Sequence, residues 1–203
     1  TRSCLVSGLG DVYKRQIMHN NLPRFFTFIK TFDKYLIKEL NNNIGIIYRN
    51  YSTDYDKRLI EKISNFCKKN NKKFYLSNNM ILAKNLGLDG VYIPSFNNLL
   101  NTSCSNHKKK FHKIGSAHSI KEIKTKEKQG VKLLFISPLF KKTVKNNFLD
   151  CVKFNILTKN TSTKIIALGG IDKKNLSRIK LTKAYGFASI AFFHKELKFK
   201  KKI

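Results

Sequence analysis

The stretch TKIIALGGID, residues 163–172, combines a short apolar strand with a glycine turn. Residues 165–168 read as a buried strand, Gly169 and Gly170 as a tight turn, and Asp172 as the cap of a following helix. Glycine has no Cβ, so its backbone can approach an anion closely and offer N–H donors to it. The same turn can equally be a purely geometric link between strand and helix, and the stretch alone leaves both interpretations open.

Strand-like runs of this kind recur along the chain and alternate with helical patterns. The helical patterns cover 33–41, 54–70, 79–86, 120–130, 147–160 and 173–185. The strand-like runs cover 24–32, 44–51, 72–77, 90–95, 111–119, 131–138, 163–168 and 187–193. Strands that are apolar on both faces and separated by helices indicate a parallel sheet covered by helices. Eight such units predict an α/β fold, a small single-domain (β/α)8 TIM barrel, with a doubly wound open sheet as the alternative.

The beginning of the chain differs in composition from the remainder. Residues 1–16 lack the bias toward Lys, Asn, Ile and Phe that follows, and the first Met is Met18. We expect residues 1–17 to be a non-native leader of sequencing or adapter origin, and the barrel to occupy residues 18–203. No apolar run is long enough to cross a bilayer, and the four cysteines are widely spaced without a metal-binding motif. These features predict a cytoplasmic protein with reduced thiols and no membrane partner.

The strong excess of basic over acidic residues raises the question of an anionic partner. The formal net charge is +29, from 41 Lys and Arg against 12 Asp and Glu. Nucleic-acid binding relies on such residues, but proteins with that function concentrate Arg and exposed aromatic rings on one element. Here the lysines are spread along the whole chain and Arg is rare. We therefore favour a solvated basic surface, which also attracts phosphorylated small molecules, over a nucleic-acid partner.

Barrels of this type carry their chemistry at the C-terminal ends of the strands. That rule selects residues that end or directly follow the strand-like runs: Arg49, Ser77, Asn78, Tyr92, Ser95, Ser116, His118, Ser137, Gly169, Gly170, Phe193 and His194. Lys141, Lys142 and Lys145 fall in the loop after the sixth run. Phosphate sites in barrels usually lie after the seventh and eighth strands. Gly169, Gly170 and His194 are therefore the predicted phosphate-binding positions.

Four segments together resemble the thiamine phosphate synthase/TenI family. They are LSNNMILAKNLGLDGVYIPS (76–95), IGSAHS (114–119), ISPLFKKTVK (136–145) and IIALGGI (165–171). The resemblance extends from Phe25 to about Phe193 and implies a small (β/α)8 barrel. It also implies an enzyme of thiamine biosynthesis that joins a thiazole phosphate to an aminopyrimidine diphosphate, with Mg²⁺ assisting departure of the diphosphate. TenI-like members of the family instead include isomerases of the thiazole phosphate.

The resemblance implies roles for residues on both halves of the predicted site. Gly169 and Gly170 match the glycines that hold the thiazole phosphate, and Arg49 matches an arginine at the diphosphate. Lys145 matches a phosphate-contacting lysine. Ser116 and His118 match a polar motif whose histidine is the acid/base candidate in the tautomerases. Ser137, Asn78 and His194 complete the expected substrate-binding set by their positions at strand ends.

The departures from the family pattern concentrate on the diphosphate half. The two aspartates that hold Mg²⁺ in the synthases are replaced by Asn78 and Asn97, and a lysine two residues after the arginine is replaced by Tyr51. An amide oxygen can ligate Mg²⁺ but brings no charge to offset the desolvation of the ion. Mg²⁺ is therefore an open expectation rather than an assigned cofactor, with no metal ligand assigned.

Three hypotheses follow from the sequence. The first is a divergent synthase in which Arg49 and the lysines at 142 and 145 replace part of the charge of the metal. The second is a metal-independent thiazole tautomerase that uses His118 as acid and base. The third is a non-catalytic or nucleic-acid-binding barrel that acts through its basic surface. The oligomeric state has no signal in the sequence.

Overall fold

The computed structural model describes residues 22–51, 56–100, 111–141 and 147–193. The leader predicted for residues 1–17 lies outside the described residues, as do Lys142, Lys145 and His194. The structural statements below concern the described residues.

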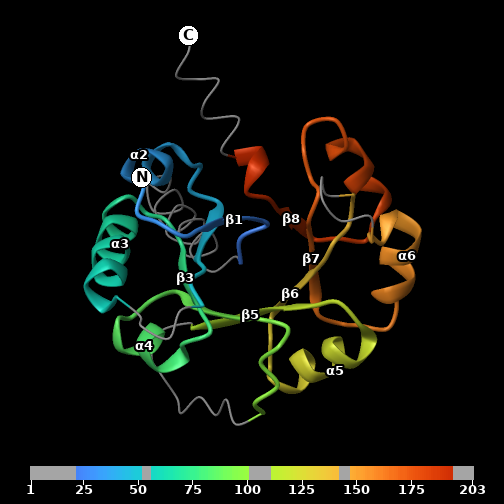
Figure 1. Ribbon diagram of the computed structural model, residues 1–203, viewed down its shortest axis with the longest axis horizontal. Coiled ribbons are helices and arrows are strands. Elements are labelled where there is room, and N and C mark those ends of the chain that lie inside the picture. Colours follow the sequence, from blue (N-terminus) through green and yellow to red (C-terminus); the bar gives the residue numbers. More distant parts are fainter. Residues whose placement is uncertain (1–21, 52–55, 101–110, 142–146, 194–203) are drawn as a thin grey trace, which may run out of the picture.

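Eight parallel strands close into a barrel in the order of the chain, with β8 pairing back to β1 (Figure 1). The strands are β1 Phe25–Ile29, β2 Ile44–Tyr48, β3 Phe74–Ser77, β4 Gly90–Ile93, β5 His112–Ala117, β6 Leu133–Ile136, β7 Lys164–Leu168 and β8 Gly186–Ala188. Closure confirms the predicted (β/α)8 barrel and excludes the open sheet. It also places the C-terminal ends of all the strands around one rim.

Helices surround this ring of strands (Figure 1). They are α2 Lys34–Glu39, α3 Lys57–Lys69, α4 Met80–Asn85, α5 Ile120–Lys128, α6 Asp150–Leu157 and the 3₁₀ helix η1 Leu176–Leu181. Four of them begin at a residue whose side chain accepts a backbone N–H of the first turn: Asp33, Asp56, Asn79 and Ser119. Such residues are the preferred N-caps, which is why these helix starts could be read from the sequence.

Aromatic rings fill the interior of the barrel. Phe26, Phe28, Tyr75, Tyr92 and Phe135 are buried there together with smaller apolar residues. The Phe135 ring lies 5.0 Å from that of Phe26 and 5.5 Å from that of Tyr92, both edge to face, an arrangement that aromatic pairs favour. A second apolar cluster packs between the strands and the helices. The interior rings therefore form a closed floor beneath the rim at the C-terminal ends.

Two predicted elements near the end of the chain are shorter than expected. The helix predicted over 173–185 is only η1, because the Asp172 carboxylate accepts the N–H groups of Lys174 and Asn175 and so holds a turn there. The strand predicted over 187–193 ends at Ala188. The Ser189 hydroxyl donates to the Ile171 carbonyl and accepts the Phe192 N–H, which starts a helical turn.

Candidate functional site

Alternate side chains of each strand point into the barrel. The inward-facing positions at the C-terminal ends of the strands therefore form the rim. Ile47, Tyr75, Ile114 and Phe135 belong to the interior cluster. Residues two positions further along a strand share its face. The interior face therefore continues, at the C-terminal ends, into polar side chains: Arg49, Ser77, Ser116, His118 and Ser137. These five predicted strand-end residues thus lie on one rim, whereas Tyr92 belongs to the interior cluster and Phe193 packs in the cluster between strands and helices.

His118 follows β5 and is held by the end of β6. Its Nδ1 lies 2.7 Å from the Ser137 carbonyl oxygen and 3.3 Å from the Ser137 hydroxyl. A carbonyl oxygen only accepts, so Nδ1 carries the proton and Nε2 is the nitrogen that gains or loses one. The His118 backbone N–H donates to the Glu122 carboxylate at 2.7 Å, which fixes the strand end to the start of α5. The side chain itself is exposed, so Nε2 is accessible from solvent.

Ser116 lies one inward position below His118. It is buried, and its side chain is hydrogen-bonded to the hydroxyl of Tyr92. Burial raises the pKa of the Tyr92 phenol, although the hydrogen bond from Ser116 and the charge of Arg49 act in the opposite direction. Tyr92 is therefore a neutral hydroxyl at neutral pH, able to orient Ser116 but not to act as a base.

The Gly169-Gly170 turn follows β7 and is packed against the segment after β6. The Phe140 N–H donates to the Gly169 carbonyl at 3.1 Å, and the Leu139 N–H donates to the Leu168 carbonyl at 2.9 Å. Both glycines have positive φ, 96° for Gly169 and 69° for Gly170. A Cβ on Gly170 would lie 2.3 Å from the Phe140 carbonyl oxygen. The turn therefore requires glycine for backbone geometry and for close approach of two loops.

The same turn keeps two backbone donors open. Among the described residues, neither the Gly169 N–H nor the Gly170 N–H donates to a protein acceptor. The Asn175 side-chain amide donates to the Gly170 carbonyl at 2.7 Å and so holds the turn from its far side. Two adjacent N–H groups without a described protein acceptor are available as donors to a bound group. The geometric and the phosphate-binding interpretations of this stretch are therefore compatible.

A hollow of about 310 Å³ lies at the ends of β1 and β2. It is lined by Lys30, Arg49, Asn50 and Tyr51. The Arg49 guanidinium carbon lies 4.9 Å from the centre of the Phe28 ring, a cation–π contact that holds the half-buried side chain against the aromatic floor. The sequence analysis predicted Arg49 but missed Lys30, because one lysine among many gives no signal until its strand register is known.

Asn78 and Asn97 lie at the ends of β3 and β4 and bind each other. The Asn97 side-chain amide donates to the Asn78 carbonyl oxygen at 2.8 Å. The Asn97 side-chain oxygen in turn accepts the Leu99 N–H at 3.1 Å. Asn78 has a φ of 58°, a left-handed conformation that Asn tolerates better than most residues. These two side chains therefore fix the loop after β4 to the end of β3.

A buried lysine that sequence reasoning missed anchors this loop from below. Lys126 of α5 has no exposed surface, and its Nζ donates to the Asn97 carbonyl at 2.6 Å. The Gln129 side chain donates to the same carbonyl and to that of Leu99, both at 2.9 Å. Burial lowers the pKa of the Lys126 ammonium to about 8, although the Glu122 carboxylate acts in the opposite direction. In the sequence, the position of Lys126 three residues after Ile123, on the same helix face, was the one available indication that Lys126 is buried.

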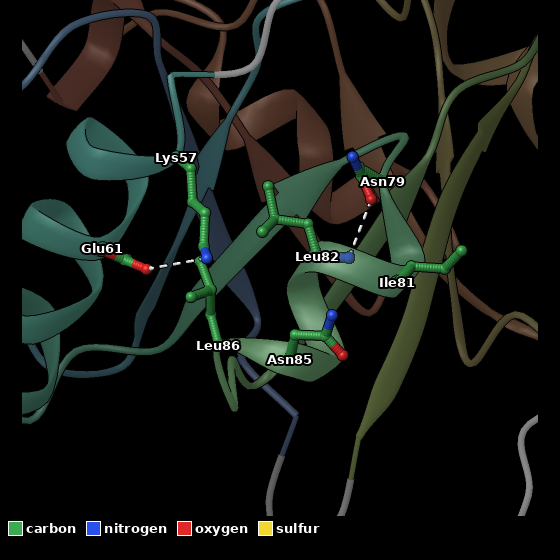
Figure 2. Close-up of a pocket in the computed structure, with 7 residues that line it drawn as sticks. All are labelled: Lys57, Glu61, Asn79, Ile81, Leu82, Asn85 and Leu86. Atoms are coloured by element: carbon green, nitrogen blue, oxygen red, sulfur yellow. Dashed lines mark hydrogen bonds and ion pairs between the residues drawn. The ribbon is translucent and has the colours of Figure 1, made fainter.

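A second hollow, of about 610 Å³, lies on the outer wall of the barrel. Figure 2 shows its lining residues on α3 and α4. It is lined by Lys57, Glu61, Asn79, Ile81, Leu82, Asn85 and Leu86. Lys57 and Glu61 pair across one helical turn at 3.8 Å, and Asn79 is occupied in capping α4. None of the predicted site residues contributes to this groove, so the rim is the candidate site.

Two buried cysteines have no place in this site. Cys67 and Cys151 are free thiols. Burial, with the nearby Asp89 carboxylate, raises the pKa of the Cys67 thiol to about 12, although Lys72 acts in the opposite direction. Burial also raises the pKa of the Cys151 thiol. Both are therefore protonated and unreactive at neutral pH.

These features define a small (β/α)8 barrel whose described rim carries basic side chains, backbone N–H groups without a protein acceptor and a histidine. The comparisons with known proteins agree with this class. The model of the thiamine monophosphate synthase family matches residues 36–193. The chain belongs to the thiamine monophosphate synthase family.

Individual relatives support the same assignment. A thiamine-phosphate synthase from the bacterium Prochlorococcus marinus is 30% identical over 142 residues, which is 66% of this chain and 40% of that protein. The chain thus spans less than half the length of this curated relative. Among solved structures, the thiamine phosphate pyrophosphorylase from Pyrococcus furiosus superposes with a TM-score of 0.68 at 15% identity, covering 91% of this chain and 96% of the other.

The fold is shared more widely than the family. FabK from Thermotoga maritima superposes with a TM-score of 0.67 at 13% identity, over 89% of this chain and 61% of that one. At such identities the likeness to solved structures shows the barrel alone. None of the helices in the described part of the chain has the length and apolar character of a membrane span.

The residues at the positions of the family aspartates do not suit a Mg²⁺ site built on carboxylates. Asn78 and Asn97 are neutral, and both side-chain oxygens already accept a hydrogen bond. Within the described residues, no group of three or more His, Cys, Asp and Glu side chains is arranged to hold a metal ion. Mg²⁺ prefers carboxylate oxygens in near-octahedral geometry. The doubtful role of Mg²⁺ stays a prediction, and what the structure adds is that the side-chain oxygens of this pair are already engaged.

Replacing Gly170 with Ala should destabilise the protein more than the same change at Gly87. Both glycines have positive φ, but a Cβ on Gly87 would meet nothing within 4 Å. We expect Gly87→Ala to lower the free energy of unfolding by about 1 kcal/mol, from backbone strain alone. Gly170→Ala adds the clash with Phe140, so we expect it to lower the free energy of unfolding by about 2–4 kcal/mol, measured by urea unfolding. Equal losses in the two variants would contradict the required close approach.

The buried Lys126 ammonium should give the protein a distinct pH dependence. Its pKa is about 8 when folded, against 10.5 for an ordinary lysine. Between these values the unfolded chain holds a proton that the folded protein has released, so the free energy of unfolding should rise with pH in this window. Lys126→Met should remove this rise, worth as much as ~3 kcal/mol. Urea unfolding of the wild-type and Lys126→Met proteins from pH 7 to 10.5 measures this dependence. If the free energies of unfolding of the two proteins changed with pH in parallel, a lowered pKa of Lys126 would be excluded.

Proposed function

We propose that the chain is a thiamine phosphate synthase-like transferase of thiamine biosynthesis. It would join a thiazole phosphate to an aminopyrimidine diphosphate, giving thiamine phosphate and pyrophosphate. In that reaction the thiazole nitrogen forms a bond to the methylene carbon of the pyrimidine, and the carbon–oxygen bond to the diphosphate breaks with its electron pair. Membership of the family and the 30% identity to a curated synthase support this proposal.

One observation carries the proposal, the open pair of N–H groups at Gly169 and Gly170. They lie after β7, where barrels bind phosphate, and among the described residues no protein acceptor takes them. The adjoining segment, which leads from Ser137 toward residue 141, packs on the same turn. We assign the phosphate of the thiazole substrate to this turn.

The opposite side of the rim suits the second phosphorylated group. Arg49 rests on the Phe28 ring and lines the hollow at the ends of β1 and β2. A guanidinium in this position can donate two parallel hydrogen bonds to a phosphate and so stabilise the charge that develops on a departing diphosphate. Lys145 would add a further phosphate contact from the loop after β6. His194, which lies outside the described residues, stays the sequence-based prediction for the thiazole-phosphate half.

Product formation tests this proposal directly. Protein comprising residues 18–203 should convert the two substrates into thiamine phosphate, detected by oxidation to the fluorescent thiochrome derivative. Arg49→Gln should lower kcat/KM by roughly 100-fold, because a charge-assisted contact made in the transition state is lost. Lys132→Gln removes the same charge from the exposed residue before β6, at the other end of the barrel, and should change kcat/KM less than about twofold. Absence of product with and without Mg²⁺ would refute the synthase.

A second candidate function is the tautomerase of the TenI-like relatives, and the geometry of His118 favours it. The contact between Nδ1 and the Ser137 carbonyl fixes the neutral tautomer that leaves Nε2 as a base. A proton could then be removed from one position of the thiazole and returned at another by the same nitrogen. No metal takes part in such a step.

The two candidate functions differ in what they require of His118. If the chain is a tautomerase, His118→Gln should lower turnover of the thiazole tautomer by about 100-fold or more, within the usual range for general acid–base catalysis. Lys132→Gln, an exposed residue at the other end of the barrel, is the matched control and should retain turnover within about twofold. Unchanged turnover in His118→Gln would exclude this function.

A further inference from the structure

The register of β1 and β2 places two cations side by side on the rim. Ile29 is paired with Tyr48, and the Arg49 N–H donates to the Ile29 carbonyl at 2.9 Å, so the next residues, Lys30 and Arg49, continue the same ladder. Neighbouring parallel strands lie about 5 Å apart. Both side chains line the hollow of about 310 Å³. Lys30 and Arg49 therefore face one small space from adjacent strands.

Within the described residues, no carboxylate compensates this pair. Neither Lys30 nor Arg49 takes part in an ion pair there, and the lining of the hollow contains no Asp or Glu. Like charges at neighbouring positions of a sheet repel each other. Arg49 is also half-buried, which adds a desolvation cost to its charge. An anion in the hollow would relieve both costs, so the arrangement suits a ligand with more than one negative charge.

The neighbouring ends of β3 and β4 are organised in a way that excludes a divalent cation. Asn78 and Asn97 satisfy each other, and the Asn97 carbonyl is held by the Lys126 ammonium at 2.6 Å. A Mg²⁺ ion at these two amides would sit close to that buried positive charge with no carboxylate to offset it. This half of the rim has therefore exchanged the acidic residues of a metal site for amides and a lysine.

We propose that the β1–β4 half of the rim binds the diphosphate part of its ligand with Lys30 and Arg49 as the cations and without a divalent metal ion. The family resemblance places a lysine two residues after Arg49, but this chain has Tyr51 there. Lys30, directly after β1, supplies the second positive charge instead. The Tyr51 hydroxyl, in the wall of the same hollow, can donate a hydrogen bond to a phosphate oxygen. This inference deepens the proposed function and rests on it only for the organic group attached to the diphosphate.

Binding of inorganic pyrophosphate tests the inference without any chemistry. We expect isothermal titration calorimetry in 150 mM NaCl to show binding in EDTA, with an affinity that added MgCl₂ does not increase. Lys30→Gln and Arg49→Gln should each weaken binding by roughly tenfold or more, the size expected for losing hydrogen bonds to a charged group. Lys30→Arg, which keeps the charge, should retain affinity within about threefold.

The matched control is Lys132→Gln, which should change affinity less than about twofold because that lysine lies at the other end of the barrel. Thermal unfolding of each variant checks that the fold is retained. Pyrophosphate binding that requires Mg²⁺, stoichiometric Mn²⁺ binding by the protein alone in electron paramagnetic resonance, or equal affinities of Lys30→Gln and Lys132→Gln would each overturn the inference.

The outcomes also separate this inference from the proposed function. Pyrophosphate binding in EDTA without formation of thiamine phosphate would refute the synthase and leave the metal-free anion site standing. Formation of thiamine phosphate together with Mg²⁺-dependent pyrophosphate binding would leave the synthase standing and refute the metal-free site.

Discussion

The packing of aromatic rings inside the barrel is the constraint on which the rim depends. Strands of three to six residues enclose a narrow space, and Phe26, Phe28, Tyr92 and Phe135 fill it with edge-to-face contacts. Lys30 and Arg49 lie two residues after Phe28 and Ile47 of this interior packing, so their charges are placed above the floor. The guanidinium of Arg49 uses the outer face of this packing as its support. The same contacts that stabilise the barrel therefore set the height of its functional groups.

The two halves of the rim are held in place by different kinds of hydrogen bond. On one side, the turn after β7 and the segment after β6 are joined through their backbones, which leaves N–H groups available for a ligand. On the other side, order comes from side chains, since Lys126, Asn97 and Asn78 form a continuous chain of hydrogen bonds from α5 to the end of β3. The backbone order of the first half leaves donors for the phosphate site that we propose there. The side-chain order of the second half instead uses up the groups that a metal ion would need.

The sequence predicted the barrel and the order of its elements, because apolar runs and N-caps are local signals. Asp33 and Asn79 could be recognised for this reason. Lys30 and Lys126 could not, since their roles follow from strand register and from helix packing, and nothing local separates them from many solvated lysines. The 3₁₀ helix η1 was missed because the turn built by Asp172 competes with a regular helix.

The pairing of β1 with β2 also bears on how relatives of this chain are compared. Residues 30 and 51 are far apart in sequence, yet both border the hollow around Arg49. A basic residue at position 30 or at position 51 would place its positive charge in the same hollow. An alignment would record such a change as a loss at one position and an unrelated gain at the other. Members of the family are better grouped by the summed charge around this hollow than by identity at single positions, and columns 30 and 51 are expected to covary.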